Sequence, residues 1–286
     1  MKSRVAATVL VAGIALVGCA PESESSTSSG SAQASDCTPE SLATLTNGKI
    51  TVATGEPAYE PWVVNDDPAN GEGFEAAVAY AVAENLGYTK DDVVWTRSTF
   101  DGAIAPGPKD FDWNLQQYSI TADREQAVDF SSPYYQVSQA VISTAGSPIA
   151  SATTVADLKS AKLGAAVGST SLNDAQEVIA PTTPVSVFND NAAAVTALKN
   201  GQIDGIVIDL PSAFYLTAAE IDNGVIVGQL PGTASGQADE FGILLAKDSP
   251  LTSCTSQAVD ALAADGTLTA LQEQWLGSAA GAPTLK

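Results

Sequence analysis

Residues 162–209, KLGAAVGSTSLNDAQEVIAPTTPVSVFNDNAAAVTALKNGQIDGIVID, alternate between strand-like and helix-like patterns. Gly168 to Ser171 supplies turn and capping residues, and Asn200-Gly201 is a typical helix stop. The segment predicts strand 162–167, helix 172–179, strand 185–188, helix 191–199 and strand 203–208, which ends at Asp209. A series in this order builds a mostly parallel sheet flanked by helices.

A similar series precedes this segment. It consists of strand 49–54, helix 74–86, strand 93–95, a short helix after Phe100 and strand 111–118. Gly87 ends the longer helix, and APGP at 105–108 keeps the other one short. After both series come only strand 241–245 and two helices about Asp265-Gly266. The pattern predicts two α/β lobes, with the last elements returning to one of them.

The N-terminus has the features of a bacterial export signal. Met1 to Arg4 is positively charged, and the apolar run Val5 to Val17 has 13 residues, too few to span a bilayer. Small residues before Cys19 resemble the lipobox, in which the thiol is lipidated and the chain is cut just before it. The alternative is an ordinary signal peptide with a chance cysteine. We expect a lipoprotein signal peptide over residues 1–18.

Residues 19–36 are expected to form the lipidated Cys19 and a flexible tether. Pro21 to Ser35 contains no aromatic or large aliphatic side chain, so it cannot bury enough apolar surface to become ordered. The anchor would hold the protein at the outer face of the cell membrane. No later stretch is apolar for long enough to cross that membrane, so a transport role needs separate membrane partners.

The composition argues against several classes of function. The formal net charge is −21, or −23 once Lys2 and Arg4 leave with the signal, which speaks against nucleic acid and against electrostatic binding to anionic lipid. The chain has no histidine, so it lacks the commonest general base, the usual Ser and Cys triads and most zinc sites. We expect no catalytic residue, no metal and no cofactor.

With Cys19 lipidated, Cys37 and Cys254 remain as a pair. In an exported protein a disulfide is favoured over two free thiols. Such a bond contributes about 4–5 kcal/mol in the chain-entropy model. It would also fasten the start of the folded part to a segment near its end, within one lobe.

Seven segments in colinear order resemble the family-3 solute-binding proteins of polar amino-acid ABC importers, such as the lysine/arginine/ornithine and glutamine binders. The segments are VATGEPAYEPW (52–62), GFE (73–75), SITADR (119–124), VDFSSPYY (128–135), VGST (167–170), GQIDGIVID (201–209) and DGTL through Trp275 (265–275). The resemblance implies a two-lobed, periplasmic-binding-protein-like α/β fold of type II, with two hinge strands between the lobes. We expect lobe 1 at 37–136 plus 237–286, and lobe 2 at 137–236.

The resemblance implies that Arg124 grips the α-carboxylate of an amino acid and that Asp209 binds the α-ammonium. Both roles suit a zwitterion, whose charges must be paired once they are desolvated. Ser169 and Thr170 stand at a strand-to-helix turn, where free backbone N–H groups favour an anion. The alternatives are local: Arg124 in a surface ion pair, and the other three residues as helix caps.

Four further positions complete the predicted site by the same resemblance. Ser119 and the backbone near Gln117 add hydrogen-bond acceptors, whereas Tyr59 and Phe100 sandwich the ligand between their rings. The alternative for either ring is packing within its own lobe.

The identity of the ligand depends on residues at or near the positions that bind the ligand in the resembling family. Glu56 stands where relatives carry an acid that reaches the ligand side chain, and Gln116 and Gln117 replace small residues. An acid plus amides favours a side chain with donors, namely glutamine, arginine, lysine, ornithine or histidine. Arg97 makes glutamate or aspartate competitive if it reaches the cleft.

The sequence thus predicts a monomeric receptor that closes on a polar amino acid and docks on an ABC permease with its ATPase. One alternative is a dehydratase-type enzyme on the same scaffold, with Glu56 or Glu240 as the acid or base. Another is an amino-acid-sensing lipoprotein that reports occupancy to a receptor.

Overall fold

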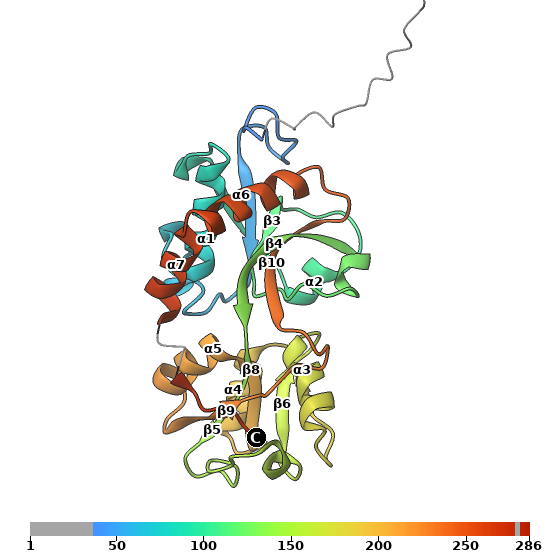
Figure 1. Cartoon of the computed structure of the whole chain (residues 1–286), viewed down its shortest axis with the longest axis vertical. Coiled ribbons are helices and arrows are strands. Elements are labelled where there is room, and N and C mark those ends of the chain that lie inside the picture. Colours follow the sequence, from blue (N-terminus) through green and yellow to red (C-terminus); the bar gives the residue numbers. More distant parts are fainter. Residues whose placement is uncertain (1–36, 278–280) are drawn as a thin grey trace, which may run out of the picture. The chain divides into compact units, whose positions relative to one another are not determined.

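The computed structural model describes residues 37–277 and 281–286. The predicted signal peptide, the lipidation site Cys19 and the tether lie outside the described residues. The described chain forms two five-stranded sheets with helices beside each (Figure 1). Within this part of the chain, no helix combines the length and the apolar character needed to cross a membrane.

The first sheet has the strand order β2-β1-β3-β10-β4. Its strands are β1 (Ile50–Thr54), β2 (Val93–Arg97), β3 (Trp113–Asn114), β4 (Val128–Val137) and β10 (Asp239–Ala246). The strand β1 pairs in parallel with β2 and β3, whereas β10 runs antiparallel to β3 and β4. The sheet is therefore mixed, with a parallel half and an antiparallel half.

The strand β3 is much shorter than the predicted strand 111–118. The backbone of Gln117 has a φ of 54°, in the left-handed region, and an extended strand cannot continue through that conformation. The chain consequently leaves the sheet before Gln117 and carries this residue toward the buried carboxylate of Glu75.

Helices pack on both faces of the first sheet. They are α1 (Phe74–Asn85), α2 (Phe100–Ile104), α6 (Thr252–Ala264) and α7 (Thr267–Leu276). In Figure 1, α1, α6 and α7 lie together, and their apolar residues share one core with Ile50 and Val52 of β1. Ala103 of α2 belongs to a separate core with Ala53, so α2 covers the opposite face.

The second sheet has the order β7-β6-β8-β5-β9 and repeats the mixed design. Its strands are β5 (Gln139–Thr144), β6 (Leu163–Ala166), β7 (Ser186–Phe188), β8 (Gly205–Asp209) and β9 (Gly224–Gln229). The strand β6 pairs in parallel with β7 and β8. The strand β5 pairs antiparallel with both β8 and β9. The three parallel strands are those predicted from residues 162–209.

Three helices accompany the second sheet. They are α3 (Thr170–Asp174), α4 (Asn191–Lys199) and α5 (Leu210–Tyr215), and the π-helical turns η6 (Ala175–Ile179) and η7 (Leu216–Glu220) extend α3 and α5. The prediction of one helix over 172–179 was therefore correct in position, but its second half is a wider π-helical turn that ends at Ala180, where φ is 48°.

The chain passes between the sheets from β4 to β5 and returns from β9 to β10 (Figure 1). The first passage lies between Val137 and Gln139, and the second between Gln229 and Asp239. The last residues differ from the expectation, because 281–286 lie against the second sheet and not with the first. Thr284 pairs with Gln229 of β9, and Leu285 is 3% exposed in the core beneath that sheet. Burial of Leu285 thus outweighs the continuity of this segment with α7 along the chain.

The predicted disulfide between Cys37 and Cys254 is present. Cys254 is buried in α6 and belongs to the core of the first sheet, and Cys37 packs against that core. The bond therefore ties the first described residue to a late helix that packs on the first sheet, within one lobe as expected.

Candidate ligand-binding cleft

A cavity of about 270 Å³ is lined by residues from both sheets and their helices. We call it the main chamber. Eight of the nine residues predicted to bind the ligand line it, namely Glu56, Tyr59, Phe100, Gln117, Arg124, Ser169, Thr170 and Asp209. Ser119 does not line it but supports two residues that do. Its carbonyl oxygen accepts a hydrogen bond from Arg124, and its Oγ lies 3.2 Å from Thr170 Oγ1.

Arg124 is a buried cation, only 8% exposed. Its Nη1 donates to the Ser119 carbonyl at 2.6 Å and its Nη2 to the Gly168 carbonyl at 2.9 Å, so it bridges the two halves of the cleft. Its guanidinium carbon lies 5.3 Å from the centre of the Phe100 ring. Among the described residues, no carboxylate lies within ion-pair distance of Arg124. The predicted alternative of a surface ion pair is therefore wrong.

Burial lowers the pKa of Arg124, whereas Tyr118, Asp239 and more distant acids raise it. Guanidinium groups nevertheless keep their charge in proteins. A buried, charged fork without a direct counter-ion is chemically suited to an incoming carboxylate.

Ser169 and Thr170 stand where β6 gives way to α3. Ser169 is the N-cap of α3, because its Oγ accepts a hydrogen bond from Leu172 N at 3.1 Å, so the capping interpretation is confirmed for this residue. Both residues nevertheless line the main chamber. Thr170 begins the helix, and its hydroxyl also reaches Ser119.

Asp209 ends β8 and faces the same chamber. Its side chain makes no capping hydrogen bond to α5, so the capping alternative is wrong here. Instead its Oδ1 accepts from Gln139 Nε2 at 2.7 Å, and the same nitrogen lies 3.4 Å from Asp239 Oδ2. Burial raises the pKa of Asp209 to about 7. The Gln139 hydrogen bond and Arg124 lower this pKa, and Asp239 raises it. Burial thus destabilises the ionised form of Asp209, and a cationic ligand group beside it would stabilise that form.

Gln139 and Asp239 were not predicted as site residues. Both are buried, and they stand at the beginnings of β5 and β10, where the chain enters each sheet. The Oε1 atom of Gln139 accepts from Ser171 Oγ at 2.7 Å, which fixes its amide so that Nε2 points at the two carboxylates. Nothing in the sequence around these two positions indicates such a network.

Gln117 is held in place by Glu75, which is 1% exposed. The backbone N–H of Gln117 donates to Glu75 Oε1 at 2.7 Å, and its Nε2 donates to Glu75 Oε2. Tyr134 Oη adds a third donor at 2.6 Å. Burial raises the pKa of Glu75 to about 7, and these hydrogen bonds lower it. Since Nε2 is bound to Glu75, the side-chain oxygen Oε1 of Gln117 is the group that can accept a hydrogen bond from a ligand in the chamber.

The two predicted aromatic residues have different surroundings. The ring of Phe100 stacks on Tyr118 with a centroid distance of 4.7 Å and packs against the core beside α2, while it also lines the chamber. Tyr59 lies in the loop after β1, and its hydroxyl oxygen is buried without a hydrogen-bond partner among the described residues. An unpaired buried hydroxyl is unfavourable and marks a place where a ligand could supply the partner.

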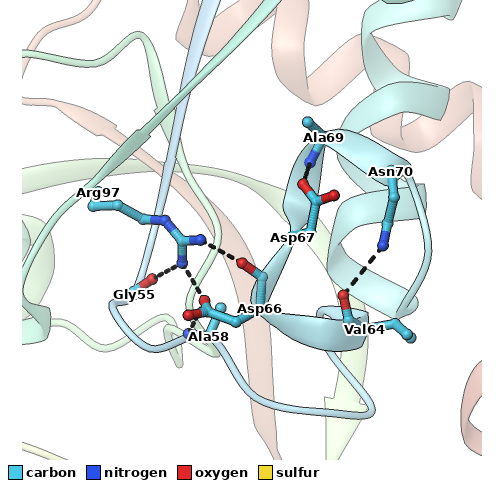
Figure 2. A network of polar contacts seen from close by, with 8 residues as sticks. All are labelled: Gly55, Ala58, Val64, Asp66, Asp67, Ala69, Asn70 and Arg97. Carbon is cyan, nitrogen blue, oxygen red and sulfur yellow. Dashed lines mark hydrogen bonds and ion pairs between the residues drawn. The ribbon is translucent and has the colours of Figure 1, made fainter.

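Arg97 does not line the main chamber. Figure 2 shows its guanidinium directed at the loop after β1, where Nη1 donates to Gly55 O at 2.5 Å and to Asp66 Oδ1 at 2.6 Å. Its Nη2 donates to Asp66 O at 2.6 Å. The loop that carries Glu56 and Tyr59 is thereby fixed to β2. Asp66 neutralises Arg97, so this arginine is not a cation for an acidic ligand.

Trp62 provides a further contact across the cleft. Its indole nitrogen donates to Ser212 Oγ of α5 at 2.8 Å, and both residues are buried. Together with the bridge from Arg124 to Gly168, this bond joins the two halves around the chamber. Trp62 falls within a sequence segment that carried the resemblance, but nothing in that segment predicted its partner.

Comparison with known proteins agrees with this geometry. The model of the bacterial extracellular solute-binding proteins, family 3, matches residues 50–278. The L-cystine-binding protein TcyJ of Escherichia coli is 27% identical over 225 residues, which cover 78% of this chain and 81% of the relative. The L-arginine-binding protein of Pseudomonas aeruginosa is 29% identical over 226 residues, which cover 77% and 85%.

Among solved structures, an ancestral arginine-binding protein bound to glutamine matches with a TM-score of 0.67 and 30% identity. The match covers 81% of this chain and 99% of that structure. The predicted two-lobed type II fold is thereby confirmed. The family consists of solute-binding proteins, and the chain is a binding protein rather than an enzyme. It belongs to the bacterial extracellular solute-binding proteins, family 3.

Proposed function

We propose that this protein captures a polar amino acid, glutamine or a basic amino acid, in the main chamber and delivers it to an ABC permease. In this proposal Arg124, with the N-terminus of α3 at Ser169 and Thr170, binds the α-carboxylate. Asp209 binds the α-ammonium together with Gln117, and Ser119, which lies behind the chamber, supports Arg124 and Thr170. Tyr59 and Phe100 enclose the side chain, and Glu56 reaches its end.

The observation that carries the proposal is that Arg124 and Asp209, two side chains of opposite charge, line the same chamber. Each is a buried or partly buried charge that lacks an opposite charge at contact distance among the described residues. A zwitterion would supply both missing partners at once. A neutral or purely anionic solute would leave the Asp209 carboxylate without a counter-charge.

The preference for a side chain with donors follows from the remaining polar groups. Glu56 and the carbonyl oxygen of Gln117 are acceptors at the chamber, and Arg97 is bound to Asp66. Among the described residues that line the main chamber, Arg124 is the one cation, and it is assigned to the α-carboxylate, so an acidic side chain would lack a partner there. The named relatives bind cystine and arginine, and the solved relative holds glutamine, which fits a polar amino acid without deciding among them.

The proposal includes export, cleavage before Cys19 and a lipid anchor at the outer face of the cell membrane. It assigns residues 37–136 and 237–277 to one lobe, and residues 137–236 and 281–286 to the other. Mass spectrometry of the protein from membranes tests the anchor, since the proposal requires an acylated Cys19 as the first residue. A free N-terminus elsewhere would contradict it.

Calorimetry of the purified protein against the common amino acids tests the binding function. At least one polar amino acid should bind more tightly than about 100 μM, or about 5.5 kcal/mol. The absence of any such ligand would reject the proposal. Genes for a permease and an ATPase beside this one would favour an importer over an amino-acid sensor.

The affinity for the amino acid should fall as the pH drops below about 7. Burial raises the pKa of ligand-free Asp209 to about 7, and an α-ammonium beside it would lower that pKa again. Binding should therefore be strongest above this pH, where the carboxylate is already ionised, and lose about tenfold per unit below it. Calorimetry in buffers of different ionisation enthalpy should detect proton release on binding, which should approach one proton per ligand as the pH falls toward 6.

Asp209→Asn provides the control for this pH dependence. The variant should bind weakly at every pH and should lose the slope. Glu75→Gln should keep the slope, although Glu75 also has a pKa raised to about 7. A slope that disappears in Glu75→Gln and survives in Asp209→Asn would contradict the assignment to Asp209.

A further inference from the structure

A second cavity of about 190 Å³ adjoins the main chamber. We call it the side chamber, the space bounded by Tyr59, Glu60, Gln117, Lys199 and Glu220. It shares Tyr59, Trp62, Gln117 and Asn191 with the main chamber, so the two spaces meet at these side chains. Its remaining wall comes from α4 and α5, on the side of the second sheet. Of the three residues proposed to contact the ligand side chain, Tyr59 lines it, whereas Glu56 and Phe100 do not.

The groups at the junction of the two chambers need hydrogen-bond donors. The Tyr59 hydroxyl is buried without a partner among the described residues. The amide nitrogen of Gln117 is bound to Glu75, which leaves its oxygen as an acceptor. The nearby indole N–H of Trp62 is already used by Ser212. A ligand group that carries several N–H donors would satisfy Tyr59 and Gln117 together.

The charges at the side chamber are mainly negative. Glu60 and Glu220 line it, and the pKa of Tyr59 is raised by burial and then by the carboxylates of Asp190, Asp66 and Glu220. Within the described part of the chain, Lys199 is the one cation in the lining, and it lies exposed at the last position of α4. The buried end of the chamber, at Tyr59, therefore has a negative potential.

We propose that the side chamber receives the cationic end of the ligand side chain, an ammonium or a guanidinium group. The α-amino and α-carboxyl groups remain at Asp209 and Arg124 in the main chamber. The methylene groups pass between Tyr59 and Gln117, and the cation donates to both of them within the field of Glu220. This inference rests on the proposed function and narrows it to long basic amino acids. It places the end of their side chain in the side chamber instead of beside Glu56, which lines only the main chamber.

Calorimetric Kd values for L-arginine, L-lysine and L-glutamine on the purified protein test the inference. Arginine or lysine should bind at least about tenfold more tightly than glutamine, since the cation gains a carboxylate and two acceptors. The decisive quantity in each variant is the ratio of the glutamine Kd to the Kd of the better basic amino acid.

Three variants should move this ratio in stated directions. Tyr59→Phe keeps the ring and removes the hydroxyl, and should reduce the ratio about three- to tenfold. Glu220→Gln should reduce it about threefold to fivefold, because a partly solvated charge is lost. Lys199→Gln removes a like charge and should raise it about twofold to threefold. Glu84→Gln, an exposed acid of α1 that lines neither chamber, should leave the ratio unchanged.

Several outcomes would overturn the inference. Glutamine binding as tight as that of arginine and lysine is one such outcome, and an unchanged ratio in both Tyr59→Phe and Glu220→Gln is another. A ratio that falls in Lys199→Gln would contradict a cationic group in this chamber, because removal of a like charge should strengthen its binding. All three outcomes leave amino-acid binding itself intact. Failure of every amino acid to bind the unmodified protein would instead reject the function proposed for the main chamber.

Discussion

Arg124→Ala should weaken amino-acid binding at least about a hundredfold, which is about 3 kcal/mol. The guanidinium is the buried cation at the main chamber, and the substitution would leave the ligand carboxylate desolvated without a counter-charge. Calorimetry should then detect no heat of binding at ligand concentrations that saturate the unmodified protein. A variant with full affinity would contradict the assigned carboxylate site.

Two further variants separate a lost contact from a damaged fold. Arg124→Lys keeps the charge but not the fork that donates to Ser119 and Gly168, and should recover only part of the affinity. Lys49→Ala removes a cation that pairs with Asp92, and neither residue lines the main chamber. It should bind normally. Thermal unfolding should show that Arg124→Ala remains folded at the temperature of the binding experiment.

Several helices and strands of this protein were predictable because clear local signals mark where they begin and end. The helix predicted over 191–199 coincides with α4, whose N-cap Asp190 accepts from Ala193 N and whose end is followed by Gly201 at a φ of 68°. Strand 111–118 failed for the opposite reason. Nothing in the residues around Gln117 indicates a left-handed backbone, which the tertiary contact with Glu75 stabilises.

The sequence predicted those residues of the candidate site that come directly after a strand or at the start of a helix. Eight of the nine predicted side chains meet at one chamber, because the ends of β1, β6 and β8 converge there. The supporting residues were not predictable. Gln139 contacts Asp209 across 70 positions of the chain, and Glu75 contacts Gln117 across 42. Such partners are set by how the sheets pack, and a single sequence contains no record of it.

Removal of the disulfide should lower the free energy of unfolding by about 5 kcal/mol, the chain-entropy value for a very long loop. Cys37 and Cys254 are 217 positions apart, so the bond restricts nearly the whole unfolded chain. Small domains have only about 5–15 kcal/mol of stability, so the effect is a large share of the total. Urea unfolding of the double variant Cys37→Ala/Cys254→Ala should show a much lower midpoint.

Reduced, unmodified protein provides the matched control for this loss of stability. Its unfolding midpoint should move close to that of the double variant, and the double variant should not respond to reductant. Neither cysteine lines the main or the side chamber, so the double variant should bind its amino acid normally wherever it is folded. Arg124→Ala should show the reverse, with weak binding and near-normal folding. If the double variant lost affinity while still folded, the disulfide would have to act on the cleft through the core of the first sheet.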